Sequence, residues 1–261
     1  MRKAALLLLV APLALTACGG SSNAQVKVDP VAYVKHSAHK TADMPSEHMT
    51  MTGSISVGLI KLTMTGSGDF ANATRQGQMV VVAGLTAAGR NLHIREVLDG
   101  TTMYLQSPAY RSQLPAGKTW MKLDLQKVGA SQGISYDAIM SQSPARALLQ
   151  LEAAGSVKSI GAETINGVET THYEVSNLDI TKLPQGAKIL ALAHPTYGPI
   201  DVWIGNEDGY VHRESLSFTY SATGQAASMA VRIDLSKFGE KVNVTIPPAR
   251  QVFDWATGLG A

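Results

Sequence analysis

Cys18 is the residue whose type and position most clearly indicate chemistry, because it is the one cysteine in a chain of 261 residues. A single thiol cannot form a disulfide within the chain, so its placement needs another explanation. Arg2 and Lys3 put positive charge at the start, and Ala4–Leu15 follows as an apolar run too short to span a bilayer. Leu15-Thr16-Ala17-Cys18 then places small residues just before the thiol. This order predicts a signal peptide that is cleaved just before Cys18.

The motif resembles the lipobox of bacterial lipoproteins, in which the cysteine is acylated, with palmitate among the attached chains, and becomes the new N-terminus. The alternative, weighed against this spacing, is a free thiol buried in a helical hairpin. Gly19–Gln25 is rich in Gly, Ser and Asn, a composition typical of a flexible tether. We therefore expect a signal peptide at 1–17, an acylated cysteine and tether at 18–28, and lipid anchoring on the extracytoplasmic face of the cell membrane.

His36 and His39 could share one face of a helix, with Glu47 and His48 a short distance along the chain. A metal site would need a third and a fourth ligand that converge, together with groups that orient them. The same pattern is typical of the solvated polar face of a helix, and this interpretation is favoured. We expect neither a metal ion nor a cofactor.

Catalytic residues are not visible in any local motif. The sequence has no Gly-x-Ser-x-Gly elbow, and Gly66-Ser-Gly-Asp-Phe lacks the spacing and the following helix of a phosphate-binding loop. The Asp and Glu residues are scattered singly, so no acid–base pair is evident. A Ser-His-Asp arrangement could still assemble in space, which keeps an exported hydrolase as an alternative. We predict that the protein is not an enzyme.

Charge excludes some classes of function. The chain has 22 basic and 20 acidic side chains, and loss of Arg2 and Lys3 with the signal peptide leaves the two balanced. A protein that binds nucleic acid would need a basic stripe, and no polybasic segment favours a membrane surface. No second run is long and apolar enough to span a membrane. We expect residues 29–261 to form a single domain, monomeric and without disulfides.

Alternation of apolar and polar residues dominates the chain after one short helix. Asp29 as N-cap and Pro30 at the first helical position predict that helix within Asp29–Met44. A hairpin follows, with strands at Met49–Val57 and Ile60–Phe70 joined at Gly58-Leu59. Further strands are expected at 75–84, 91–100, 102–107, 118–125, 156–165, 168–177, 198–220 (a hairpin around Asn206–Gly209) and 227–238, and a second helix at Ser141–Gly155. Asp179–Ile200 is ambiguous. The sum is an α+β protein with about ten antiparallel strands.

These strands carry more apolar surface than two helices can cover. An antiparallel sheet with one apolar face must cover it with helices, another sheet or a ligand, so partial cover predicts an apolar cavity. A fully packed core is the alternative. Each methylene group of an acyl chain buried there would contribute about 0.8 kcal/mol. The alternation predicts that the cavity is lined by Ile55, Val57, Leu62, Met64, Met79, Val81, Leu92, Ile94, Met103 and Leu105, with the two helices as its lid.

Several stretches, taken in order after the lipobox, resemble the LppX/LprG family of actinobacterial lipoproteins. They are 99–108 (DGTTMYLQSP), 114–125 (LPAGKTWMKLDL), 143–176, 199–216 and 231–248. The resemblance covers nearly all of the chain after Cys18. It implies a strongly curved antiparallel half-barrel, LolA/LolB-like, whose helices close the concave side over an apolar cavity for lipid tails. It implies no catalytic residues, and Cys18 is the one functional residue that it transfers.

The expected function is that of a membrane-anchored lipoprotein that binds lipid or acylated glycolipid and carries it toward the cell envelope. The partners implied are the lipid or glycolipid ligand, the cytoplasmic membrane through acylated Cys18, and a membrane transporter; nucleic acid is not among them. The alternative from another class is a packed interaction domain that modulates a membrane or cell-wall protein.

Overall fold

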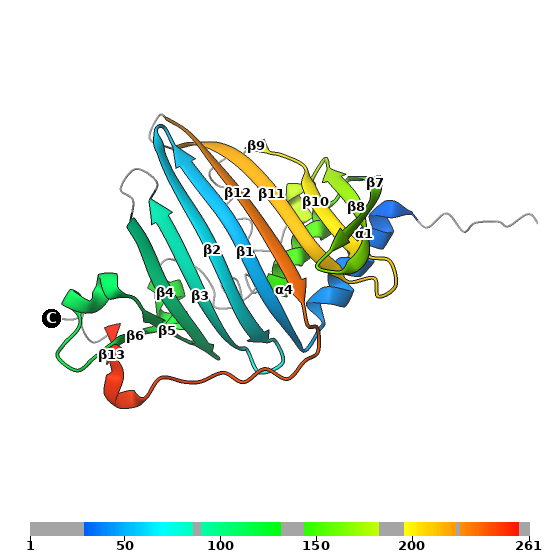
Figure 1. Cartoon of the computed structure of the whole chain (residues 1–261). Helices are drawn as coiled ribbons and strands as arrows, with labels where there is room; N and C mark the ends of the chain where they lie inside the picture. Colours follow the sequence, from blue (N-terminus) through cyan, green and yellow to red (C-terminus); the bar gives the residue numbers. More distant parts are fainter. Residues whose placement is uncertain (1–28, 86–89, 132–143, 183–195, 223–224, 256–261) are drawn as a thin grey trace, which may run out of the picture.

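The computed structural model describes residues 29–85, 90–131, 144–182, 196–222 and 225–255 (Figure 1). The predicted signal peptide and tether lie outside these ranges, and Cys18 lies with them. So do the start of the predicted second helix and most of the ambiguous segment Asp179–Ile200. Within the described ranges, no helix is long and apolar enough to cross a membrane.

One large sheet makes up most of the molecule. Its order is β13-β6-β5-β4-β3-β2-β1-β12-β11-β10-β8-β7, and β9 pairs with β11 beside this path. The prediction of a mainly β protein with a large, mostly antiparallel sheet and few helices is confirmed. The strands are β1 Ser46–Val57, β2 Ile60–Ala71, β3 Gln76–Leu85, β4 Arg90–Asp99, β5 Thr102–Gln106, β6 Trp120–Asp124, β7 Ser156–Ile165, β8 Val168–Ser176, β9 Thr196–Tyr197, β10 Ile200–Gly205, β11 Val211–Ala222, β12 Gln225–Ser236 and β13 Val252–Asp254.

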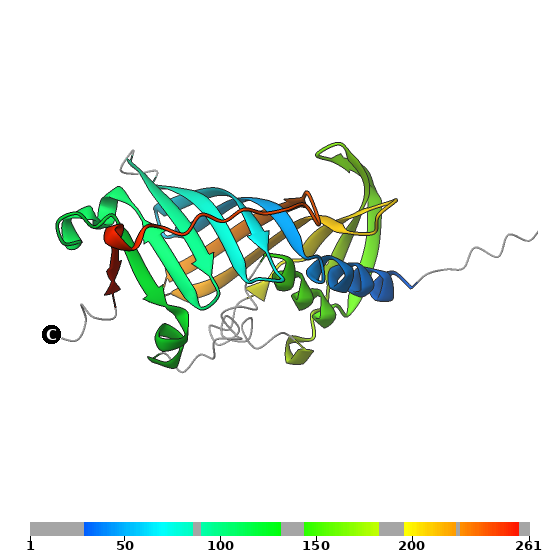
Figure 2. The same cartoon turned by 90° about the horizontal axis from the view of Figure 1, so that it is seen from below.

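The sheet is not wholly antiparallel, which corrects the prediction. β13 pairs with β6 in parallel, with Val252 opposite Trp120 and Asp254 opposite Lys122. After β12, residues 237–248 run along the ends of the strands without helix or strand structure (Figures 1 and 2). The chain then enters β13 beside β6, and the two strands run in the same direction. A segment that crosses the sheet in this way can add a parallel strand without a helical crossover.

The β1–β2 hairpin forms as predicted. Val57 pairs with Ile60, and Gly58 turns the chain with a φ of 55°, a conformation that favours glycine. Apolar side chains of both strands share one face, and Thr or Ser hydroxyls occupy the other. The register thus follows from the alternation in the sequence.

The first helix, α1 (Pro30–Ala42), also forms as predicted. The Asp29 carboxylate accepts a hydrogen bond from the backbone N–H of Val31 at 3.1 Å and caps the helix, and Pro30 occupies the first turn. Val34 and Ala38 are fully buried on its inner face. The helix packs on the segment that follows Pro144, and on β7 and β11.

The predicted second helix is helical from Pro144 but irregular. One turn of α-helix, α4 (Pro144–Ala147), continues as a 3₁₀-helix, η3 (Leu148–Ala153). We call 144–153 the helical segment. It ends before Gly155, where a Cβ atom would collide with the carbonyl oxygen of Asn177. The other helices are short: η2 Pro108–Gln113, α2 Leu125–Ser131, η4 Ile180–Lys182 and η5 Ala249–Gln251.

The described helices α1, α4 and η3 cover one end of one face of the sheet (Figure 2). The core lies beneath them and includes Val34, Leu148 and Leu151 from the helices and Val202 and Leu235 from the sheet, all nearly inaccessible. At the far edge of the sheet, β7 pairs only with β8, and its register shifts between Ser159 and Gly161, which marks a β-bulge.

Candidate functional site

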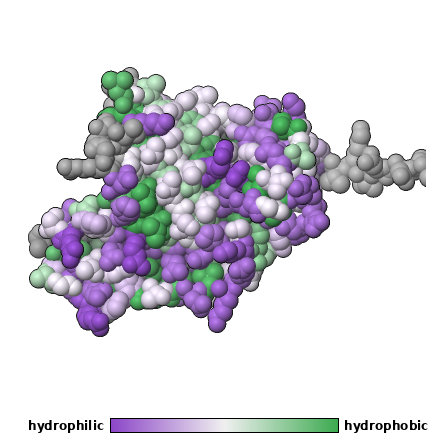
Figure 3. All heavy atoms as spheres, in the orientation of Figure 1, coloured by the Kyte–Doolittle hydropathy of each residue, from purple (hydrophilic) through white to green (hydrophobic). Residues whose placement is uncertain are grey.

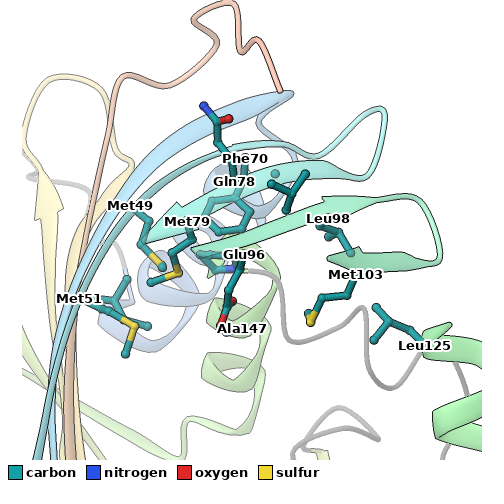
Figure 4. Close-up of a pocket in the computed structure, with 14 residues that line it drawn as sticks. Met49, Met51, Phe70, Gln78, Met79, Glu96, Leu98, Met103, Leu125 and Ala147 are labelled. Carbon is teal, nitrogen blue, oxygen red and sulfur yellow. The ribbon is translucent and has the colours of Figure 1, made fainter. Parts of the chain in front are cut away.

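An apolar pocket of about 360 Å³ lies between the sheet and the helices α2 and α4 (Figure 4). It opens on the same face that carries the core. Strands β1 to β5 supply most of its wall, and four methionines are prominent in it. The lining residues are Met49, Met51, Phe70, Gly77, Gln78, Met79, Glu96, Val97, Leu98, Met103, Leu125, Pro144, Ala147 and Ile233.

Glycines in β2 and β3 make room for these long side chains. A Cβ atom on Gly66 would lie 2.9 Å from Cγ of Met51 and would collide with the methyl group of Met79. A Cβ atom on Gly77 would lie 2.6 Å from the ring of Phe70. Methionine is unbranched and flexible, so the resulting surface can adjust to irregular apolar shapes.

The ten predicted lining residues all fall on the pocket face of the sheet, as the strand registers show. The structure brings Met79 and Met103 into the pocket wall. The others continue the same face away from the pocket and are half-buried: Ile55, Val57, Leu62, Met64, Val81, Leu92, Ile94 and Leu105. Their contact with a ligand stays a prediction. Of the predicted lid, the second helix reaches the pocket through Pro144 and Ala147, whereas α1 packs behind it.

The alternation of apolar and polar residues also indicates pocket residues that were not among the ten predicted ones. Met49 and Met51 precede Ile55 on the same face of β1, and Leu98 continues the face of Leu92 and Ile94. Phe70 and Ile233 also follow the alternation of their strands, whereas Leu125 depends on how distant segments pack, and nothing local in the sequence indicates it.

Glu96 is the one ionisable side chain among the residues that line the pocket. It stands on β4 between Ile94 and Leu98, on the apolar face. Burial raises the pKa of its carboxyl group above the usual value, because the surrounding groups solvate the charged form poorly.

Glu214 and Glu47 are two further buried carboxyl groups, and both lie where the helical segment meets the sheet. Glu214 on β11 is 2% exposed, and its Oε1 accepts a hydrogen bond from Nε2 of Gln150 at 3.0 Å. Its Oε2 has no hydrogen-bond partner in the described part of the chain. Burial raises the pKa of Glu214 to about 7, and the hydrogen bond from Gln150 lowers it by less.

Glu47 on β1 has the same character. Its Oε2 accepts a hydrogen bond from Nδ2 of Asn72 at 2.5 Å, and the backbone N–H of Ala145 also bonds to the carboxyl group. Burial outweighs both and raises the pKa of Glu47 to about 7. Each carboxyl group therefore changes its protonation near neutral pH, in contact with the helical segment.

The histidines considered for a metal site are not brought together. His36 and His39 are exposed on α1, and Nε2 of His39 lies 2.9 Å from Oε1 of Glu152. His48 lies on the other face of the sheet from Glu47, where its Nδ1 meets the Asp69 carboxylate at 2.7 Å. Among the described residues, no group of three or more His, Cys, Asp or Glu side chains could hold a metal ion.

A Ser-His-Asp chain does occur, on the face away from the pocket. Nε2 of His48 lies 3.3 Å from the Ser67 hydroxyl, and its Nδ1 lies 2.7 Å from Asp69. A hydrolytic triad also needs donors for the oxyanion close to its nucleophile. Ser67 sits in the middle of a regular strand, opposite Thr50 on one side and Val80 on the other. The backbone around it belongs to the sheet ladder, so we interpret the chain of hydrogen bonds as structural.

The fold and the site define a protein with one large sheet, helices on its apolar face and a methionine-rich pocket between them. No family model matches the sequence. An uncharacterized 31.2 kDa protein of Streptomyces griseus, from the rplA–rplJ intergenic region, is 25% identical over 253 residues, covering 88% of this chain and 80% of its own length.

Two crystal structures show the same fold over most of the chain. The Mycobacterium tuberculosis lipoprotein LppX matches with a TM-score of 0.50 and 17% identity, covering 84% of this chain and all of LppX. LprF from Mycobacterium bovis matches with a TM-score of 0.51 and 16% identity, covering 84% of this chain and 96% of LprF. The structural similarity that the sequence motifs predicted is therefore confirmed.

Proposed function

We propose that this chain is a non-enzymatic lipoprotein, anchored through Cys18, that holds the acyl chains of a lipid or glycolipid on the apolar face of a curved half-barrel. The observation that carries the proposal is the pocket, whose wall is apolar apart from Gln78 and Glu96 and is rich in methionine. The fold that it shares with the lipoprotein LppX supports the same role.

The size of the pocket fits part of such a ligand. Small-molecule sites have volumes of roughly 300–1,000 Å³, so about 360 Å³ accepts a section of a long chain rather than a whole lipid. The half-buried residues that continue the face, such as Met64 and Ile94, would contact the remainder. Contacts of this kind favour methylene groups without specifying a headgroup.

The domain that binds the ligand would comprise residues 29–261, on the extracytoplasmic face of the membrane, with 18–28 as its tether. In this proposal the protein receives the ligand from a membrane transporter and carries it toward the cell envelope. An acylated N-terminus explains why Cys18 stands where it does, just after the apolar run that starts the sequence.

The test is extraction of lipid from the protein purified in mild detergent. Organic solvent should release a lipid in near-stoichiometric amount, identified by mass spectrometry, whereas the covalent anchor stays with the polypeptide. Removal of the extracted lipid should lower the thermal midpoint, and its re-addition should raise the midpoint again. A protein that yields no bound lipid, and whose stability does not respond to added lipid, would instead be the packed interaction domain.

A further inference from the structure

The strands β1, β2, β3, β11 and β12 are almost without charge at one of their ends. The distal half of the β1–β2 hairpin, residues 50–68, contains a single ionisable side chain, Lys61. The matching half of the β11–β12 hairpin, residues 215–231, contains no Asp, Glu, Lys, Arg or His, and neither does the stretch 76–84 of β3. These segments are neighbours in the sheet, and the N–H of Gly58 lies 3.5 Å from the carbonyl oxygen of Ala226. The opposite end of the same strands carries Glu47, His48, Asp69, Arg213 and Asp234.

The tip of this uncharged end is apolar and exposed. Leu59 is fully exposed and Ile60 is 59% exposed, and they are two of the few large hydrophobic side chains on the described surface. Figure 3 shows hydrophobic surface at the end of the molecule where Figure 1 places the β1–β2 turn. Two adjacent apolar side chains exposed at a hairpin tip add nothing to the core, and they form a candidate contact site.

Other turns of the sheet show that this composition is not a property of its hairpins in general. The β10–β11 turn contains Asn206-Glu207-Asp208-Gly209, and the β7–β8 turn contains Asn166-Gly167. Both follow the usual preference for polar turn residues. Gly58-Leu59 departs from it, because the residue after the glycine is a leucine whose side chain is fully exposed.

We propose that this uncharged end, with Leu59 and Ile60 at its tip, inserts into the headgroup region of a lipid bilayer that contains anionic lipid. Transfer of the leucine and isoleucine side chains out of water is favourable. The Thr and Ser hydroxyls beside them can still form hydrogen bonds in the polar headgroup region, so their transfer costs little free energy. Lys61 is exposed next to the tip and complements a negative lipid surface. The absence of Asp and Glu from residues 50–68 removes the repulsion that such a surface would otherwise exert.

The anchor does not prevent this contact. The eleven residues 18–28 reach about 40 Å at most when fully extended, and the twelve-residue strand β1 is itself roughly 40 Å long. An anchored Cys18 therefore allows the domain to move relative to the membrane over a distance comparable with the length of this strand. The inference stands apart from the proposed function, because it requires a membrane contact and no ligand in the pocket.

The experiment uses the mature chain reconstituted in vesicles of phosphatidylglycerol and phosphatidylethanolamine. Leu59→Cys supplies a thiol for an environment-sensitive fluorophore, and Glu207→Cys, at the polar β10–β11 turn, is the matched control. The wild-type chain should take up no dye if Cys18 is acylated; if it is labelled, both variants are remade with Cys18→Ser. The label at 59 should shift its emission to the blue and be quenched by lipid-borne quenchers, whereas the label at 207 should report water.

Ile60→Asp added to Leu59→Cys should lower the inserted fraction about tenfold. Emission at 59 that matches emission at 207 would overturn the proposal. A blue shift that lipid-borne quenchers do not affect would overturn it too, since the tip would then contact protein. Neither result bears on whether lipid is extracted from the pocket, so failure of this proposal and failure of the proposed function are distinguishable.

Discussion

Gln150 of the helical segment and Glu214 of β11 are joined by a hydrogen bond of 3.0 Å across the boundary between helix and sheet. The amide donates to a carboxyl group that is buried and whose second oxygen has no partner within the described residues. The hydrogen bond therefore connects the helical segment to the sheet through the Glu214 carboxyl group, whose neutral form is favoured by burial.

This relationship predicts that the free energy of unfolding falls as the pH rises from about 4.5 to about 7. The pKa of Glu214 is raised from 4.5 to about 7 in the folded chain, and that of Glu47 rises equally. The folded state binds these protons more tightly than the unfolded state, so the stabilisation is complete below pH 4.5 and lost above pH 7. Each of the two carboxyl groups lowers the free energy of unfolding by about 3 kcal/mol at most over this pH range. Urea unfolding between pH 5 and 8 measures the slope.

Glu214→Gln provides the matched variant, because an amide keeps the shape and remains neutral at every pH. We expect this variant to be more stable than the wild type at pH 8 and to lose about half of the pH dependence. Glu207→Gln, at the exposed β10–β11 turn, is the control and should change neither quantity. Equal slopes for wild type and Glu214→Gln would contradict the assignment.

Larger side chains in the pocket should reduce ligand binding without reducing the stability of the fold. Met103→Trp and Ile94→Trp add volume on the pocket face, at half-buried positions. We expect bound lipid to fall severalfold, while the thermal midpoint of the lipid-free variant stays close to that of the lipid-free wild type. In a packed core the same substitutions would lower the free energy of unfolding by roughly 1–3 kcal/mol. Val80→Trp, on the opposite face of β3 and 46% exposed, is the control and should keep its lipid.

Cys18→Ser tests the anchor. The side chain that accepts the lipid would be lost, so we expect the protein to accumulate as uncleaved precursor or to leave the membrane. Detergent-phase partitioning and the mass of the N-terminal peptide report the result. Stable attachment needs more than one acyl chain. Wild-type partitioning of Cys18→Ser would show that the thiol does not carry the anchor.

Ser67→Ala tests the interpretation of the Ser-His-Asp chain as structural. We expect the wild type to show no hydrolysis of p-nitrophenyl esters above background, and Ser67→Ala to behave identically. Loss of the 3.3 Å contact with His48 should change stability by about 1 kcal/mol or less. An esterase activity that vanishes in Ser67→Ala but survives Ser54→Ala, a change on the same face of the hairpin, would reinstate the hydrolase alternative.

Local patterns predicted the elements whose cause is local. Asp29 and Pro30 placed α1, and alternation with Gly58 placed the β1–β2 hairpin, because caps and turns act over a few residues. The parallel pairing of β13 could not be predicted, since it depends on the path of 237–248 across the strands. In β4 the predicted lining stops at Ile94, whereas the structure continues the same face through Glu96 to Leu98.

The two outer strands of the described sheet determine how the protein behaves at high local concentration. An open sheet invites a second molecule to add a strand at its border. At one border β13 is only three residues long. At the other, the bulge in β7 between Ser159 and Gly161 breaks the row of free backbone groups, and Lys158 and Glu163 flank it. Neither border offers a straight template, so we expect neighbouring molecules to remain separate even at high surface density, without fibre formation.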